Sequence, residues 1–286
     1  MRTNDAIDRF LMDSQVGGIA NSTLDKYRQQ LTQWARSMPE TLEEISYETL
    51  LEYFAAWGVG PKTRRNVITL VKQLFQYVNR VGYVDAHDPA QPLRLPRLKK
   101  QPPRFLTAAE VKRLITICRQ PLLDRESDRW YVYRNVAIVV TLAETGLRVS
   151  ELCNLRRCNI HLTEHYADVV VKGDKRNTVV FNERTVNALR EHWDRQDGGV
   201  YCIENPNGDQ VSTGGVRRLF NRLSERLGRR VYPHLLRHTC ATHMIKKAVN
   251  VFYVQQQLGH ESLDTTLNYT HTNIEDRVAA HRSVLD

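Results

Sequence analysis

The decisive stretch of this sequence reads Tyr232-Pro-His-Leu-Leu-Arg-His-Thr239, then Leu258-Gly-His260, then Ser262-Leu-Asp-Thr-Thr-Leu-Asn-Tyr269. His234, Arg237 and His238 are spaced i, i+3 and i+4, so they share one face if this segment is a helix. A guanidinium forms bidentate hydrogen bonds with phosphate oxygens, and imidazoles accept and donate protons. The stretch therefore predicts a site that binds and transforms a phosphate.

Two further motifs lie upstream of this stretch. They read Glu144-Thr-Gly-Leu-Arg148-Val-Ser-Glu151-Leu and Val171-Lys172-Gly-Asp-Lys175. Taken in order, the five motifs resemble the signature of the tyrosine recombinase family, the phage-integrase and Xer-like site-specific recombinases. The resemblance covers residues 105 to 270 in motifs and reaches back to about residue 22 in architecture. A single fragment would be weak, but five in the family's order are specific.

The resemblance implies a catalytic set and its chemistry. Tyr269 would be the nucleophile, joining the DNA 3′-phosphate covalently and freeing a 5′-hydroxyl. The other roles would be phosphate binding by Arg148, Arg237 and His260, proton donation to the 5′-oxygen by Lys172, and assistance in proton transfer by His234. Lys175 occupies the same predicted turn as Lys172, so either lysine can be the acid. Because the phosphotyrosine stores the bond energy, we expect no cofactor, neither ATP nor a metal.

Charge is distributed unevenly along the 286 residues, whose formal net charge is +9. Residues 1–59 carry five Lys/Arg against nine Asp/Glu, whereas residues 60–104 carry ten against two. Residues 213–250 carry nine against one. Two concentrated basic regions are what a two-domain clamp around a DNA duplex needs. The candidate DNA contacts are Lys62, Arg64, Arg65, Arg94, Arg97, Lys99, Lys100, Lys175, Arg217, Arg218 and Arg222.

The pattern of apolar residues predicts a mainly α-helical chain with a small β-sheet, an α+β fold. Residues 1–87 would form a bundle of four helices, which the resemblance implies is a SAM-like, core-binding domain, and residues 88–104 a basic linker rich in proline. Residues 105–286 would form the catalytic domain, with a hairpin near residues 167–181 and a helix opened by the capping box Thr107-x-x-Glu110.

The expected partner, by the same resemblance, is double-stranded DNA with paired inverted-repeat core sites. Residues 273–286 have the spacing of a short amphipathic helix. We expect this helix to dock on a neighbouring protomer and to give a homo-tetramer on two DNA sites; docking on its own domain is the equal alternative. Integration, excision and resolution of mobile elements or replicon dimers all fit this reading.

Nothing in the sequence indicates a membrane or an oxidising compartment. No run of 18 apolar residues occurs, and the N-terminus has no hydrophobic signal core. The five cysteines include no Cys-x-x-Cys pair, so we expect reduced, packed thiols. These features predict a cytoplasmic protein, and the resemblance implies that it is associated with the nucleoid of a prokaryote.

Three other functions compete with recombination. His234, His238 and His243 could hold a metal in a hydrolase, but no carboxylate lies between them and Arg237 would repel the ion. A binding-only protein with vestigial catalytic residues is disfavoured because every expected residue type is present. A topoisomerase would share the chemistry without strand exchange; the small N-terminal helical domain favours recombination by resemblance.

Overall fold

The computed structural model describes residues 1–84, 88–98, 104–120, 128–171, 175–195 and 199–259. The chain divides into two compact units, Met1–Lys100 and Gln101–Asp286. Each unit has its own core of buried apolar side chains. The predicted class is confirmed, because helices dominate and a single three-stranded sheet occurs in the described ranges. None of the helices in these ranges is both long and apolar enough to cross a membrane.

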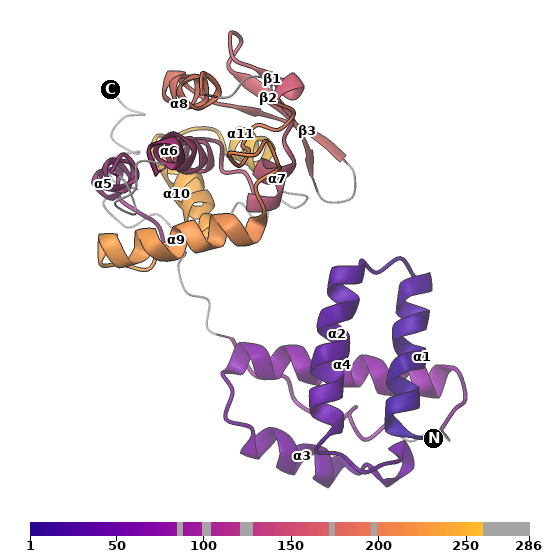
Figure 1. Ribbon diagram of the computed structural model, residues 1–286. Helices are drawn as coiled ribbons and strands as arrows, with labels where there is room; N and C mark the ends of the chain where they lie inside the picture. Colours follow the sequence, from indigo (N-terminus) through magenta and orange to yellow (C-terminus); the bar gives the residue numbers. More distant parts are fainter. Residues whose placement is uncertain (85–87, 99–103, 121–127, 172–174, 196–198, 260–286) are drawn as a thin grey trace. The chain divides into compact units, whose positions relative to one another are not determined.

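The first unit is a bundle of four α-helices (Figure 1). They are α1 (Thr3–Val16), α2 (Asn21–Ala35), α3 (Tyr47–Ala56) and α4 (Pro61–Arg80), with the short 3-10 turn η1 (Leu42–Glu44) before α3. Helix α4 begins with a proline, which suits a first helical turn because its missing N–H needs no partner there. Its apolar stripe packs around Trp34, which is completely buried. The bundle expected from the sequence is therefore present.

The predicted linker starts too early. Its first residues belong to the bundle, because Ala90 and Leu93 are buried in the core of the first unit. Two cations of α4 also hold this segment: Lys72 Nζ donates to the carbonyl of Gln91 at 2.9 Å, and Arg65 donates to the carbonyl of Pro96 at 3.0 Å. Proline density gave no sign that this segment packs on the first unit.

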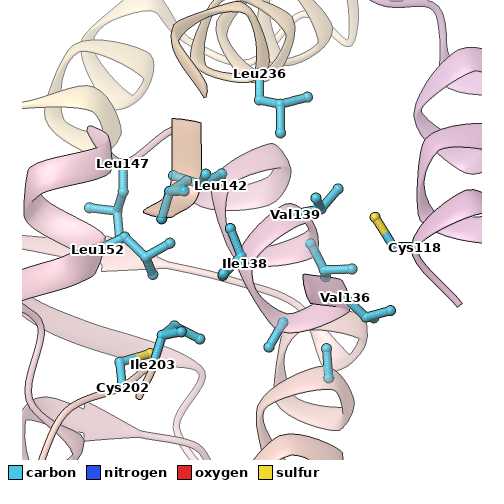
Figure 2. Close-up of a cluster of buried hydrophobic side chains, with 14 of the residues drawn as sticks. Cys118, Val136, Ile138, Val139, Leu142, Leu147, Leu152, Cys202, Ile203 and Leu236 are labelled. Carbon is cyan, nitrogen blue, oxygen red and sulfur yellow. The ribbon is translucent and has the colours of Figure 1, made fainter. Parts of the chain in front are cut away.

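The second unit is built around α6 (Asp128–Thr145), a largely buried helix that packs against α5 (Ala108–Cys118) and α8 (Glu183–Trp193). Figure 2 shows apolar side chains of this helix, such as Ile138 and Leu142, together with those of neighbouring segments, such as Leu152 and Leu236. The remaining helices are α7 (Val149–Asn154), η2 (Arg157–Asn159), α9 (Thr213–Leu227), α10 (Pro233–Lys246) and α11 (Val251–Leu258). Helices α8 and α9 begin directly after Asn182 and Ser212, whose side chains cap them.

The sheet of the second unit is antiparallel, in the order β1-β2-β3. Its strands are β1 (Ile160–His161), β2 (Tyr166–Val171) and β3 (Lys175–Val180). Asp168 pairs with Thr178 in the middle of the β2–β3 hairpin, and their side chains hydrogen-bond at 2.8 Å. The predicted hairpin is confirmed, and helix α11 lies along the outer edge of β3.

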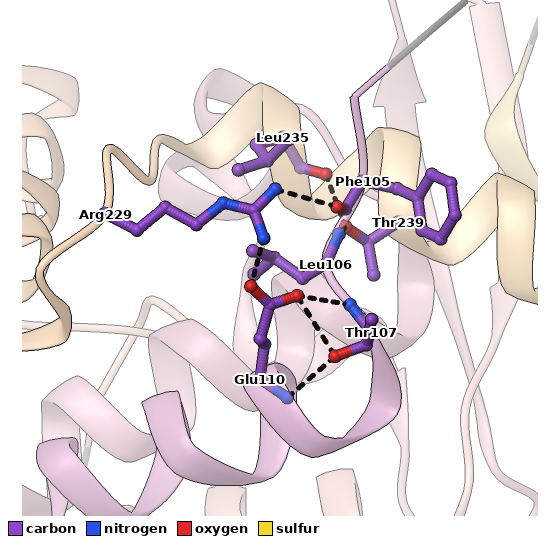
Figure 3. Close-up of polar contacts among 7 residues, drawn as sticks. All are labelled: Phe105, Leu106, Thr107, Glu110, Arg229, Leu235 and Thr239. Atoms are coloured by element: carbon purple, nitrogen blue, oxygen red, sulfur yellow. Dashed lines mark hydrogen bonds and ion pairs between the residues drawn. The ribbon is translucent and has the colours of Figure 1, made fainter.

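The start of the second unit is fastened to α10 and to the end of α9 (Figure 3). Thr107 and Glu110 form the predicted capping box of α5. Arg229 pairs with Glu110 and donates to the carbonyl of Phe105 at 3.1 Å. The Leu106 N–H donates to the hydroxyl of Thr239 at 3.0 Å, and this bond is buried. The threonine of the His-Thr motif therefore anchors the chain that enters the unit.

Candidate active site

Arg148 stands at the turn between α6 and α7. Gly146, two residues earlier, breaks the helix with a positive φ of 68°. Glu151 accepts from the Arg148 backbone N–H at 2.7 Å and from its guanidinium at 2.6 Å. The Glu151 side chain is 5% exposed and that of Arg148 is 38% exposed. The buried Glu151 carboxylate thus holds one end of the Arg148 guanidinium, while the Arg148 side chain remains accessible to solvent.

Arg237 occupies the centre of the site. It is 2% exposed and donates to two backbone carbonyls, that of Gly146 at 2.8 Å and that of Leu258 at 2.6 Å. These acceptors lie on opposite sides of Arg237 in the sequence, one in the Arg148 turn and one at the end of α11. The arginine therefore brings three separate segments together at one point.

His234 and His238 lie one turn apart on α10, as the i, i+4 spacing predicted, and their ring centroids are 4.4 Å apart. Partial burial lowers the pKa of His234, and the positive charges of Arg237 and Arg148 lower it further. Burial first, then His234 and Arg237, lower the pKa of His238 to about 4. Both imidazoles are therefore neutral at neutral pH, and His234 feels the charge of both arginines.

The end of α11 meets the edge of the hairpin. Gly259 ends this helix with a φ of 60°. A Cβ at Gly259 would lie 3.2 Å from the Asn177 amide nitrogen and 3.4 Å from Val171 Cγ1. Glycine suits this position because of its positive φ, and a larger residue would press on the Asn177 side chain. The site is thus bounded by the Arg148 turn, α10, the end of α11 and the β2–β3 hairpin.

Three of the six predicted catalytic residues, Arg148, His234 and Arg237, meet at this site. Lys172, His260 and Tyr269 lie outside the described residues, so their places in the site and all six roles stay predictions. Sequence reasoning missed several supporting groups. The acceptors of Arg237 are backbone carbonyls, which leave no trace in a sequence, whereas a glutamate three residues after Arg148 was a usable signal.

The histidines of the competing metal site do not form a ligand cluster. Within the described part of the chain, no three His, Cys, Asp or Glu side chains come close enough together to hold a metal ion. The ring of His243 faces Phe105, with a centroid separation of 6.3 Å.

The five cysteines are free, and Cys158 alone among them is exposed. The Cys240 thiol lies against the site and donates to the Glu144 carbonyl at 3.2 Å.

The predicted DNA contacts fall into two groups. Arg64 and Arg65 are half-buried and donate to carbonyls of their own unit, those of Trp57 at 2.6 Å and Pro96 at 3.0 Å. Both therefore already have structural partners. The exposed members are Lys62, Arg94, Arg97, Lys175, Arg217, Arg218 and Arg222. Lys99 and Lys100 lie outside the described residues.

A comparison of the whole sequence with known families agrees with this geometry. The sequence profile of the phage integrase family matches residues 104–276, which contain every motif of the site. The chain belongs to the phage integrase family of tyrosine recombinases. It is therefore a site-specific DNA recombinase, an enzyme that cleaves and rejoins DNA strands; the 3′-phosphotyrosine mechanism is general to the family.

Individual relatives are distant but cover nearly the whole chain. The tyrosine recombinase XerC of Pelobacter propionicus is 28% identical over 88% of this chain and 85% of its own length. The Tn1549 transposon integrase in complex with transposon right end DNA superposes with a TM-score of 0.80 at 17% identity, covering 100% of both chains. A λ integrase tetramer bound to a Holliday junction gives a TM-score of 0.77 at 18% identity, over 94% of this chain and 77% of that one.

Proposed function

We propose that Arg148, Lys172, His234, Arg237, His260 and Tyr269 form one catalytic set. The phenolic oxygen of Tyr269 bonds to phosphorus while the bond from phosphorus to the 5′-oxygen breaks. The phenol loses its proton to a base, which His234 assists, and the 5′-oxygen takes a proton from Lys172, with Lys175 as the alternative acid. The arginines and His260 stabilise the charge on the non-bridging oxygens. The phosphotyrosine keeps the bond energy for rejoining, so the reaction balances without ATP.

One observation carries this proposal: the two carbonyl contacts of Arg237. They hold the Arg148 turn and the residue that precedes Gly259-His260 against the same guanidinium. His234 sits close enough to both arginines for their charges to lower its pKa. A neutral imidazole beside two fixed cations is suited to accept a proton while a phosphate is bound.

The proposed partner is duplex DNA carrying paired inverted-repeat core sites, which the two basic regions would clamp. The relatives' own complexes support this partner, since one holds a transposon end and another a Holliday junction. Exposed cations that contact phosphates position a protein without reading sequence. We further propose that the chain works in the cytoplasm, on nucleoid DNA, in integration, excision or resolution.

We also propose a homo-tetramer held together by the C-terminal helix. A cavity of about 1070 Å³ opens among α5, α6, α8 and α10, lined by apolar side chains that include Val111, Ile115, Val140 and Met244. The segment 273–286 of a neighbouring copy offers Val278, Ala279, Ala280 and Val284. Burial of these side chains would supply the energy of assembly.

A nicked suicide substrate tests the nucleophile, because loss of the short strand traps the covalent complex. We expect the unaltered protein to form a protein–DNA adduct, Tyr269→Phe to form none, and both to bind the site equally. Tyr253→Phe is the matched control, since Tyr253 is an exposed tyrosine of α11, 65% accessible. An adduct with Tyr269→Phe equal to that of the unaltered protein would show that the nucleophile is wrongly assigned.

Deletion of residues 275–286 tests the assembly. The sizes of complexes on one and on two core sites are compared by light scattering, and cleavage is measured separately. We expect single-site binding to survive while the tetramer on paired sites is lost. Unchanged assembly would mean that the segment docks on its own domain.

A further inference from the structure

One side-chain amide joins three parts of the site. Gln257 of α11 is 7% exposed. Its Oε1 accepts from the Val180 N–H at 3.0 Å, and its Nε2 donates to the Val180 carbonyl at 2.9 Å and to the Thr145 carbonyl at 3.1 Å. Both N–H donors and the oxygen of the amide are therefore used. A buried amide with every group paired fixes its neighbours strongly, because any displacement leaves a polar group unpaired.

The amide acts on the free edge of the sheet. Strand β3 pairs with β2 on one side, so its other edge presents unpaired backbone groups. Gln257 bonds both the N–H and the carbonyl of Val180 on that edge, as a neighbouring strand would. A second bond runs parallel to it, from the Asn177 side chain to the Gln256 carbonyl at 3.0 Å. The hairpin is thus tied to α11 at two points along β3.

The tied segments are those that carry the proposed catalytic groups. Strand β2 ends at Val171, immediately before Lys172, and β3 begins at Lys175. The other partner, Thr145, directly precedes Gly146, whose carbonyl accepts from Arg237. Gln257 itself precedes Leu258, the second acceptor of Arg237. The amide binds Val180 at the end of the hairpin opposite the lysine turn, and Asn177 is bound nearer to that turn. Gln257 therefore ties β3, and through it the lysine-bearing hairpin, to the two segments that hold Arg237.

We propose that Gln257 is a positioning residue for DNA cleavage. It holds the lysine-bearing hairpin against the two segments whose carbonyls accept from Arg237. This inference rests on the proposed function, because it needs a lysine of the hairpin to protonate the 5′-oxygen. Gln257 acts through Val180 and Thr145. Its removal lets the hairpin shift, and a displacement of about 1 Å can cost about 10²-fold in rate.

The test exploits the chemistry of the leaving group. A substrate with sulfur in place of the bridging 5′-oxygen releases a thiolate, which needs no proton because a thiol has a pKa near 8.5. We expect Gln257→Leu to cleave the oxygen-linked suicide substrate about 10²-fold more slowly than the unaltered protein, and the sulfur-linked substrate within about threefold of it. An equal loss on both substrates would overturn the inference.

Three controls separate this inference from general damage. Gln256→Leu makes the same exchange at an exposed neighbour and should cleave both substrates normally. Arg237→Ala should lose activity equally on both substrates, since it binds phosphate oxygens. Lys172→Ala and Lys175→Ala identify the acid. If the sulfur-linked substrate restores cleavage by neither lysine variant, the general acid is wrongly assigned in the proposed function, and the inference about Gln257 fails with it. If one is rescued but Gln257→Leu is not, the inference alone fails.

A second variant covers the case in which Gln257→Leu does not fold. Gln257→Glu keeps the shape and the acceptor for the Val180 N–H, but it faces two carbonyls with no donor. Burial and these carbonyls raise the pKa of the new carboxyl, so acidification restores an O–H donor. We expect its cleavage rate, relative to the unaltered protein, to rise as the pH falls from 8 to 6. A constant ratio would contradict the inference.

Discussion

Replacement of Gly146 by alanine should damage the site through the backbone. The Cβ of an alanine would lie 2.5 Å from Leu258 Cδ2, and Leu258 is 2% exposed, so the leucine cannot swing into solvent. The positive φ of 68° costs an alanine about 1–2 kcal/mol. Overpacking against a buried side chain adds about 1–3 kcal/mol. The free energy of unfolding of the second unit should therefore fall by about 2–5 kcal/mol.

Gly228 supplies a matched control for this prediction. It has nearly the same φ, 69°, but a Cβ there meets nothing within 4 Å. Gly228→Ala should show the conformational cost of about 1–2 kcal/mol alone. Denaturant unfolding at a constant m-value measures both variants, and the difference between them is the steric term. In a Leu258→Ala background, which lacks the clashing atom, Gly146→Ala should cost less stability than it does in the unaltered protein.

Gly146→Ala should also cleave DNA slowly, since the Gly146 carbonyl is one of the two acceptors of Arg237. We expect the rate on a suicide substrate to fall by about 10²-fold for a backbone shift of about 1 Å. The reasoning is refuted if Gly146→Ala is no less stable than Gly228→Ala, or if it cleaves at the normal rate.

Two further predictions concern ionisable groups. Glu151→Gln removes the negative charge that holds the Arg148 guanidinium. Because Arg148 is partly solvated, we expect the free energy of unfolding to fall by about 1–2 kcal/mol, with normal unfolding cooperativity. Cleavage should be slower, and an unchanged cleavage rate would contradict this role of Glu151. Burial and the nearby charges of Arg157, Arg134 and Arg195 lower the pKa of His192 to about 4, so protonation favours the unfolded chain. The stability that neutral His192 provides is complete above its unfolded pKa near 6.5 and is lost as the pH falls toward 4. Between pH 7.5 and 5 the unaltered protein should lose about 2 kcal/mol more than His192→Phe; parallel pH profiles would refute this.

Much of the second unit could be predicted from local patterns. The i, i+4 histidines lie on one helix face, the glycine caps α11, and Thr107 and Glu110 form their capping box, because each depends on residues a few positions apart. The hairpin followed from its β-branched runs in the same way. Membership of the family rested on five motifs in a fixed order, which no single local pattern could imitate.

The failures of prediction arise where partners are distant or are backbone atoms. Nothing in the sequence indicated that Arg65 donates to a carbonyl 31 residues away. Ala90 and Leu93 are too few and too isolated among prolines to signal burial. Gln257 resembles the neighbouring glutamines of its helix, and only the fold shows that it faces the edge of β3.

The anchoring of Arg237 has a consequence for how the enzyme tolerates change. Both acceptors are main-chain oxygens, which every amino acid possesses, so no substitution at residues 146 or 258 can delete them outright. Substitutions near these two carbonyls can inactivate the enzyme only by changing the backbone conformation. They should therefore concentrate at positions that determine that conformation. Much of the surrounding sequence is then free to drift without disturbing the guanidinium.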